Sequence, residues 1–241
     1  MKPSIAKHPE QNVIRVTENL RKIRDLLAKA CDDAGRGDRP VKLLAVSKKQ
    51  PVSCIKAAVS AGQRDFGENF VQEGLEKIAA IGRNDLVWHF IGHLQSNKTR
   101  FVAAHFDWVH TVDRLKIAER LSEQRPPGQP DLNICLQVNI DKEPGKAGVS
   151  VDEVLPLAKS VAALPRIKLR GLMCLPAIRV GFDAQRKPFA RMRELYNALE
   201  RDGFEVDTLS MGMSDDFRAA IFEGSTIVRI GTAVFGARRN S

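Results

Sequence analysis

One lysine in this chain stands where it could act as a reactive amine. Lys48 follows the apolar run 43–46, which we interpret as a strand buried on both faces, and Pro51 behind it suits the first turn of a helix. An amine at the carboxyl end of such a strand, withdrawn from water, becomes nucleophilic and forms Schiff bases with aldehydes. The alternative is a solvated loop lysine, which is what most lysines are.

Two glycine-containing turns near the end of the sequence predict an anion site. Gly212 and Ser214 follow one apolar run, and Gly231 and Thr232 follow the next. Glycine lets backbone N–H groups approach an anion closely, and the hydroxyl groups can donate to it. Ser214 taken alone would suggest simple capping of the helix that follows. The second turn makes phosphate binding the better interpretation.

Other polar or pocket-type residues also fall at strand ends. Asn69 follows the second apolar run, Met213 lies inside the first glycine turn, and Arg229 ends an otherwise apolar run. A charge in such a run must be paired or face a ligand. A lysine beside an anion site favours an aldehyde that carries a phosphate, and pyridoxal 5′-phosphate meets both requirements. His89 and His93 are more typical of satisfied or exposed histidines than of catalytic bases.

Apolar periodicity predicts the elements that position these residues. We expect strands at 43–46, 65–69, 86–91, 107–110, 132–139, 167–173, 206–210 and 226–230. Helices are expected at 13–34, 52–61, 71–81, 95–104, 111–124, 151–164, 182–201 and 215–222. Eight strands alternating with helices predict an α/β fold, a single (β/α)₈ TIM-type barrel with an extra N-terminal helix. An open doubly wound sheet is the alternative, although no G-x-G-x-x-G follows the first strand.

Composition is that of an ordinary soluble protein of 241 residues, 43% hydrophobic and 28% charged. We expect residues 1–12 to be a flexible leader and residues 13–241 to form a single domain. The start of the chain lacks the apolar segment of a signal peptide, and no apolar run reaches membrane length, so we expect a cytoplasmic protein. Four widely spaced cysteines without a CxxC pair indicate buried thiols in a reducing compartment and no metal site.

The net charge of +9 does not by itself predict nucleic-acid binding. The basic residues are spread along the chain, and no interleaving of basic and aromatic residues suggests stacking on bases. An anionic small molecule explains a basic surface equally well. We expect no nucleic-acid partner, no membrane partner and a monomer.

Several long strings carry a resemblance to a known family that spans almost the whole chain after its first dozen residues. They are LLAVSKKQP, AGQRDFGENFVQEG, WHFIGHLQSNK, NIDKEPGKAGV, LRGLMCLP, LSMGMSDDF and VRIGTAVFGAR. In these strings the chain resembles the pyridoxal phosphate homeostasis proteins (the YggS/PROSC group).

The resemblance implies a barrel similar to the N-terminal domain of alanine racemase, with pyridoxal phosphate held as an internal aldimine. It implies that Lys48 is the aldimine lysine and that Arg229 faces the pyridine nitrogen. It further implies that Ser214, Gly231 and Thr232 hold the phosphate group. Asn69 and Met213 would line the pocket. The chain departs from the common family pattern in its Lys49, Gln50 and Phe70, where Thr, Lys and Tyr are usual.

A carrier or regulator in vitamin B6 homeostasis, without a catalytic residue of its own, is the function we expect. A racemase needs a second base across the cofactor, and related racemases take a tyrosine from a separate β-domain. Here the sole tyrosine, Tyr196, lies in an expected helix, and we expect no further domain after the last strand. Apo-enzymes that use the cofactor would be the recipients. The alternatives are a single-domain racemase using His93 or a cysteine, and a barrel that binds an anionic metabolite without a Schiff base.

Overall fold

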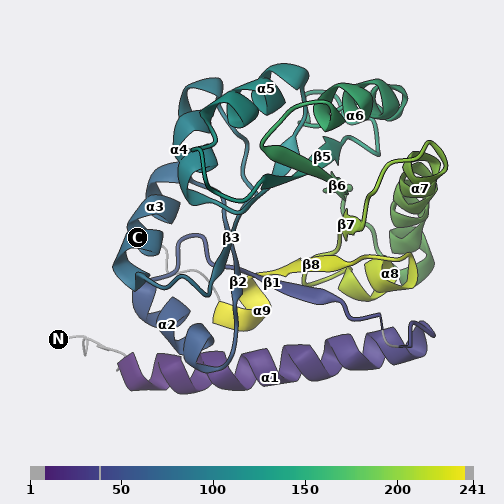
Figure 1. The fold of residues 1–241 in the computed structure, drawn as a ribbon. Helices are drawn as coiled ribbons and strands as arrows, with labels where there is room; N and C mark the ends of the chain where they lie inside the picture. Colours follow the sequence, from purple (N-terminus) through teal and green to yellow (C-terminus); the bar gives the residue numbers. More distant parts are fainter. Residues whose placement is uncertain (1–8, 38, 237–241) are drawn as a thin grey trace.

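A closed parallel barrel forms the centre of the molecule. The computed structural model describes residues 9–37 and 39–236, and within them eight strands follow one another around the barrel in sequence order (Figure 1). The strands are β1 Lys42–Val46, β2 Asp65–Glu68, β3 Val87–Phe90, β4 Trp108–Val112, β5 Leu132–Val138, β6 Ile167–Cys174, β7 Thr208–Ser210 and β8 Ile227–Ile230. The barrel closes because β1 pairs in parallel with β8, Lys42 lying opposite Ile227 and Ala45 opposite Ile230. The predicted (β/α)₈ barrel is confirmed, and the open sheet is wrong.

Helices follow the strands and pack around the outside of the barrel (Figure 1). They are α1 Pro9–Asp33, α2 Val52–Ser60, α3 Val71–Ile81, α4 Thr99–His105, α5 Leu115–Gln124, α6 Val154–Ala162, α7 Phe182–Arg201, α8 Phe217–Phe222 and α9 Thr232–Phe235. Short 3-10 turns, η1 Ser96–Lys98 and η2 Val151–Glu153, lead into α4 and α6.

The extra N-terminal helix predicted from the sequence is α1. Its buried residues Val16, Leu20, Ile23 and Leu27 recur at helical spacing, so they lie on one face. That face packs against α2, α8 and α9, and α1 runs across the outside of the helix ring (Figure 1). The helix starts at Pro9, four residues before the expected start. The rest of the expected leader lies outside the described residues, and the division into leader and domain stays a prediction.

Element boundaries differ from the predictions where loops begin. Residues 111–124 were expected to be helical, but Thr111 and Val112 extend β4, and α5 begins at Leu115. Both residues are β-branched and buried, which favours a strand. The helix expected at 215–222 begins at Phe217, and the short helix α9 after β8 was not predicted.

Alternating residues of the strands serve two different cores. Leu43 and Ala45 of β1 belong to the large core between the barrel and its helices, whereas Leu44 belongs to a small cluster with Ile91 and Ile227. This alternation follows from the two-residue period of a strand. A second small cluster inside the barrel consists of Trp108, Cys135 and Met173.

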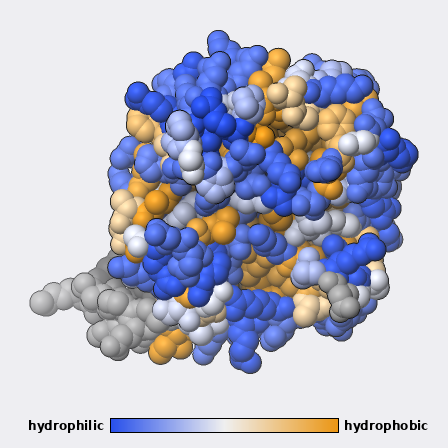
Figure 2. Space-filling model, viewed as in Figure 1, coloured by the Kyte–Doolittle hydropathy of each residue, from blue (hydrophilic) through white to orange (hydrophobic). Residues whose placement is uncertain are grey.

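The outer face in Figure 2 is largely hydrophilic, with hydrophobic residues visible in the recesses. No helix in the described part of the chain combines the length and the apolar character needed to cross a bilayer.

Candidate functional site

A cavity of about 620 Å³ opens at the carboxyl ends of the strands. We call it the strand-end cavity. All of the residues predicted for the site line it, namely Lys48, Asn69, Met213, Ser214, Arg229, Gly231 and Thr232. They come from the ends of β1, β2, β7 and β8, which are far apart in sequence. Closure of β8 onto β1 brings the lysine to the same cavity as both glycine turns.

A buried ion-pair cluster holds the loop that carries Lys48 in place. Lys77 of α3 donates hydrogen bonds from its Nζ to the carbonyl oxygen of Ser47 at 2.6 Å and to Glu68 Oε1 at 2.8 Å. Ser47 donates to the same Oε1 at 2.5 Å. Behind Lys48, the backbone N–H of Lys49 donates to Glu73, which also accepts from Lys77 at 2.7 Å. The residues on both sides of Lys48 are therefore tied to one buried lysine.

A sharp turn follows directly, because Lys49 has a φ of 59°, in the left-handed region that non-glycine residues rarely adopt. Lys49 and Gln50 are two of the departures from the family pattern. Gln50 lines the strand-end cavity, whereas the backbone of Lys49 serves to anchor the loop.

The first glycine turn has a backbone that only glycine adopts without strain. Gly212 has a φ of +96°, and a Cβ there would lie 2.7 Å from Cβ of Ala220 on α8. Asp216 accepts the backbone N–H of Met213 at 2.6 Å and occupies the N-cap position of α8. The capping role considered for Ser214 is therefore wrong, because another residue holds that position.

The second glycine turn joins β8 to α9. A Cβ on Gly231 would lie 3.2 Å from the carbonyl oxygen of Val46, the last residue of β1. A larger residue here would press on the strand that delivers Lys48. Thr232 is exposed at the first position of α9 and lines the cavity.

Arg229 is buried under the cavity and is held by oxygen atoms alone. Its Nη1 donates to the carbonyl oxygen of Ser210 at 2.5 Å and to Ser210 Oγ at 2.8 Å, and its Nη2 donates to the carbonyl oxygen of Cys174 at 2.8 Å. Burial lowers the pKa of Arg229, with Cys174 and Asp216 acting in the opposite direction, but a guanidinium keeps its proton in proteins. The site therefore contains a permanent, oriented cation.

Asn69 and Met213 border the cavity on different sides. Oδ1 of Asn69 is buried and has no hydrogen-bond partner among the described residues, an unusual state that a ligand donor would relieve. Gly92 makes room for the main chain of Asn69, since a Cβ on residue 92 would lie 2.0 Å from the carbonyl oxygen of Asn69. Met213 is 38% exposed, at the mouth of the cavity.

Apart from Met213, the apolar residues that line the cavity were not predicted for the site. They include Val46, Ile91, Met173 and Leu175. Met173 is buried as well as being part of the lining. The strand pattern alone assigns such residues to a core, because it does not tell which end of the barrel a side chain faces.

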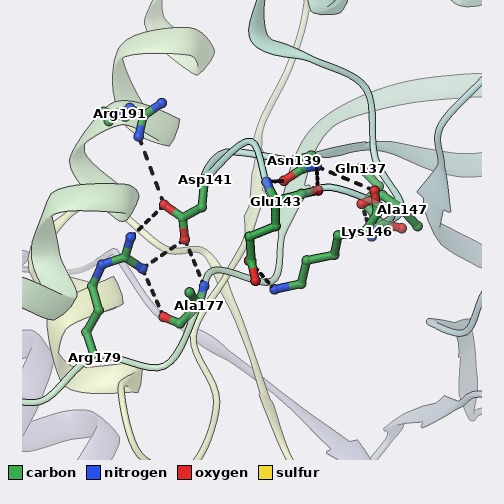
Figure 3. A network of polar contacts seen from close by, with 9 residues as sticks. All are labelled: Gln137, Asn139, Asp141, Glu143, Lys146, Ala147, Ala177, Arg179 and Arg191. Atoms are coloured by element: carbon green, nitrogen blue, oxygen red, sulfur yellow. Dashed lines mark hydrogen bonds and ion pairs between the residues drawn. The ribbon is translucent and has the colours of Figure 1, made fainter.

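A polar network that the sequence did not reveal braces the rim loops after β5 and β6 (Figure 3). Asp141 accepts Arg179 Nη1 at 2.8 Å, Arg179 Nη2 at 2.7 Å and the backbone N–H of Ala177 at 2.8 Å. Burial acts to raise the pKa of Asp141, but the hydrogen bonds of Arg179 and Ala177 outweigh it and hold that pKa below its ordinary value. Asp141 therefore fixes the segment that begins with the lining residue Leu175.

The same picture shows how the first of these loops folds on itself. Asn139 donates from Nδ2 to the carbonyl oxygen of Glu143 at 2.8 Å, and Lys146 pairs with the Glu143 carboxylate at 2.5 Å. Gln137 donates to the carbonyl oxygen of Ala147 at 3.1 Å. The loop after β5 is thus ordered by hydrogen bonds and an ion pair between its own residues.

Residues considered as second bases do not line the strand-end cavity. His93 is exposed and borders a different hollow, and the hydroxyl group of Tyr196 donates to the carbonyl oxygen of Val206 at 2.7 Å on the outside of the barrel. All four cysteines are buried, and burial raises the pKa of Cys174 to about 12. Among the described residues, no group of histidine, cysteine, aspartate and glutamate side chains is arranged to hold a metal ion.

Comparison with known proteins gives consistent matches over nearly the whole chain. The family described as alanine racemase, N-terminal domain, matches residues 13–239. The pyridoxal phosphate homeostasis protein of Pseudomonas aeruginosa is 53% identical over 223 residues, which are 92% of this chain and 96% of that protein. The pyridoxal phosphate homeostasis protein of Escherichia coli is 50% identical over 226 residues, covering 92% and 97%.

A solved structure agrees with the fold as well. PipY of Synechococcus elongatus, with pyridoxal phosphate bound, is 36% identical and matches with a TM-score of 0.80. The match covers 92% of this chain and 100% of that one.

Proposed function

This chain belongs to the alanine racemase N-terminal domain family and, within it, to the pyridoxal phosphate homeostasis proteins, and from that premise we propose that it binds pyridoxal 5′-phosphate in the strand-end cavity. It acts as a carrier or regulator of that cofactor. The observation that carries the proposal is the meeting of Lys48, the two glycine turns and Arg229 in one cavity. An amine, an anion cradle and a cation match the aldehyde, phosphate and ring nitrogen of this one molecule.

Each group of the cavity has a part in holding the cofactor. Lys48 attaches covalently, its amine condensing with the aldehyde carbon with loss of water to form a Schiff base. Ser214, Thr232 and the backbone N–H of Gly231 hold the phosphate group. The buried, unpartnered Oδ1 of Asn69 supports the fit, because a polar ligand supplies the missing donor.

Arg229 argues for storage rather than turnover. Pyridoxal phosphate, when bound, supplies an electron sink for carbanion chemistry, and its strength depends on the groups near the ring nitrogen. A guanidinium cannot give up its proton, so Arg229 leaves that nitrogen unprotonated. The sink is then weak, which suits a protein that keeps the cofactor and passes it on.

The positions of the residues weighed as second bases support the same proposal. The residues that a racemase of this kind could use, His93, Tyr196 or a cysteine, lie elsewhere in the described structure. Apo-enzymes that need the cofactor are the proposed recipients. A monomeric state and a cytoplasmic location stay predictions.

The test is the visible absorption spectrum of the purified protein incubated with pyridoxal phosphate, before and after borohydride reduction. We expect a Schiff-base band and a reduced adduct on Lys48, both lost in Lys48→Ala. Lys49→Ala is the matched control and keeps both. A protein that binds the cofactor without a Schiff-base band and without a borohydride-reduced adduct would support an anion-binding barrel, and an adduct that persists in Lys48→Ala would place the attachment elsewhere.

A second assay separates carrier from racemase. The loaded protein is incubated with a panel of L-amino acids, and the products are resolved by chiral chromatography. We expect no enantiomer exchange at enzymic rates. Exchange that depends on Lys48 would overturn the carrier proposal and leave cofactor binding in place.

A further inference from the structure

A line of buried polar side chains crosses the interior of the barrel and ends at Arg229. Its Nη1 lies 2.8 Å from Ser210 Oγ, which lies 2.8 Å from Nδ1 of His110. The other nitrogen of His110 lies 2.9 Å from Nδ1 of His89, and Nε2 of His89 lies 3.1 Å from Oδ1 of Asp65. We call these five residues the interior chain. Its three middle members have no solvent exposure.

The two ends of the interior chain lie at opposite ends of the barrel. Asp65 is the first residue of β2 and pairs with Lys42, the first residue of β1, at 3.0 Å. That end reaches solvent, because the Lys42 side chain is 43% exposed. Arg229, at the other end, lines the strand-end cavity. No step of the proposed cofactor binding uses Asp65, His89, His110 or Ser210.

Hydrogen-bond chemistry determines which way each proton points. Arginine can only donate, so Ser210 Oγ accepts from Arg229, while an ionised Asp65 can only accept, so Nε2 of neutral His89 carries a proton. Nδ1 of His89 is then an acceptor, which requires a proton on Nε2 of His110. Nδ1 of His110 in turn accepts the hydroxyl proton of Ser210. Every donation therefore runs from Arg229 toward Asp65.

Charges around the interior chain agree with these protonation states. Burial acts to raise the pKa of Asp65, but its bonds to His89 and Lys42 hold that pKa below the ordinary value, so the carboxylate is ionised. Burial lowers the pKa of His89, against the pull of Asp65 and of the nearby Asp107. Burial lowers the pKa of His110 well below its ordinary value, and the neighbouring His89, Arg229 and Lys42 lower it further. Both histidines are neutral near pH 7.

We propose that Asp65, acting through His89, His110 and Ser210, is a positioning residue for Arg229. By accepting at one end, it selects a single tautomer of each histidine and a single direction of the Ser210 hydroxyl group. Ser210 then presents only lone pairs to Arg229, and the guanidinium keeps one orientation beneath the ligand. No proton is delivered to the ligand, because arginine ends the chain and does not release one. The part that concerns the ligand rests on the proposed function.

The first experiment needs no ligand. Ring ¹⁵N and ¹H NMR of the protein at pH 7 identifies the tautomers, with the signals assigned through His89→Gln and His110→Gln. We expect a proton on Nε2 of both histidines. Asp65→Ala removes the acceptor of the His89 Nε2 proton, and Lys42, which contacts the same carboxylate oxygen as His89, can donate to Nε2 in its place. We therefore expect Nδ1–H signals to emerge on both rings.

Two variants make that result specific. Asp65→Asn keeps an oxygen acceptor without the charge and should retain both Nε2–H tautomers. Asp207→Ala removes another carboxylate at the amino end of a strand, one that pairs with Arg170 and lies outside the interior chain, and should change neither ring. A proton on Nδ1 of either histidine in the unmodified protein overturns the proposal. So do unchanged tautomers in Asp65→Ala.

The second experiment measures the effect at the ligand, using pyridoxal phosphate as the probe. We expect Ser210→Ala and Asp65→Ala to weaken its binding roughly fivefold or more, because Arg229 loses part of its support. Ser122→Ala is the control, since that buried serine bonds to Pro165 on the outside of the barrel. Unchanged affinity in both chain variants overturns the role at the ligand. Failure of the unmodified protein to bind the probe would overturn the proposed function, while the NMR result would still decide on the positioning role.

Discussion

The ammonium group of Lys77 lies 2.6 Å from the carbonyl oxygen of Ser47, so a buried side chain of α3 grips the residue just before Lys48. The lysine proposed to bind the cofactor is thus placed by a different lysine, which binds the neighbouring Ser47 across 30 positions of sequence. The hydrogen bond is made to the main chain next to Lys48, so it fixes the point from which the reactive side chain leaves the backbone. This arrangement leads directly to the first prediction.

Lys77→Met should destabilise the fold. The side chain of Glu68 has no solvent exposure, and burial raises its pKa above the ordinary value even with Lys77 beside it. Without Lys77, a carboxylate would stay buried with no cation, so we expect the free energy of unfolding to fall by about 3–5 kcal/mol in urea denaturation. The double variant with Glu68→Gln should recover much of the loss. An unchanged unfolding midpoint for Lys77→Met would show that the cluster does not hold the loop.

Gly212→Ala should lower the free energy of unfolding by more than an ordinary replacement of glycine by alanine does. The new Cβ would have a left-handed backbone and would lie 2.7 Å from Cβ of Ala220, so we expect a loss of roughly 2–4 kcal/mol in unfolding free energy. Gly203→Ala is the matched control, because Gly203 has a φ of +86° but open space around its Cβ. We expect about 1–2 kcal/mol there, from the backbone alone. Equal losses at the two positions would refute the packing argument.

Ser214→Ala and Thr232→Val should weaken phosphate binding selectively. Each removes one hydroxyl donor to the proposed phosphate site, and we expect the affinity for pyridoxal phosphate to fall by about threefold to tenfold in each variant. Pyridoxal, which lacks the phosphate group, should bind all variants alike. Ser160→Ala, on the exposed face of α6, is the control. A parallel loss of pyridoxal affinity would mean that these hydroxyl groups do not contact phosphate.

Arg179→Ala should loosen the loop after β6. Arg179 and the backbone of Ala177 both bind Asp141, and the same segment brings Leu175 to the cavity (Figure 3). We expect faster hydrogen exchange over residues 175–181 and faster release of pyridoxal phosphate, measured by stopped-flow absorbance. Arg83→Ala, which breaks an exposed ion pair, should alter neither rate. If release stays unchanged while exchange rises, the loop does not control access to the ligand.

Acid should remove the contribution of Asp141 to the stability of the folded protein. Its pKa in the folded protein lies below the ordinary 3.8, so the folded state favours the ionised form. The resulting stability is fully present above the unfolded pKa, and it is lost as the pH falls through the folded value. In unfolding experiments from pH 7 down to pH 3, Asp141→Asn should be less stable than the parent at pH 7. The difference between their free energies of unfolding should shrink as the pH falls. A gap that widens in acid would contradict this sign.

Much of the site could be predicted because it depends on local sequence. Each predicted residue stands at the end of a recognisable apolar run, and parallel strands bring such ends to one rim. That reasoning needs only the position of a residue within its own strand. It was less reliable at boundaries, as at Thr111, where two β-branched residues could continue a strand or begin a helix.

The sequence by itself determined the order of the eight strands and of the helices between them, the family, and seven of the residues that line the strand-end cavity. Periodicity and short motifs are local properties, and each can be recognised without knowing its neighbours in space. Only the tertiary structure decided that Lys77 holds Ser47, that Asp141 binds Arg179 and Ala177 at the rim, and that hydrogen bonds connect Asp65 to Arg229 through two histidines and a serine. These contacts join residues far apart in the chain, and they exist because barrel closure sets the register and the inward face of every strand at once.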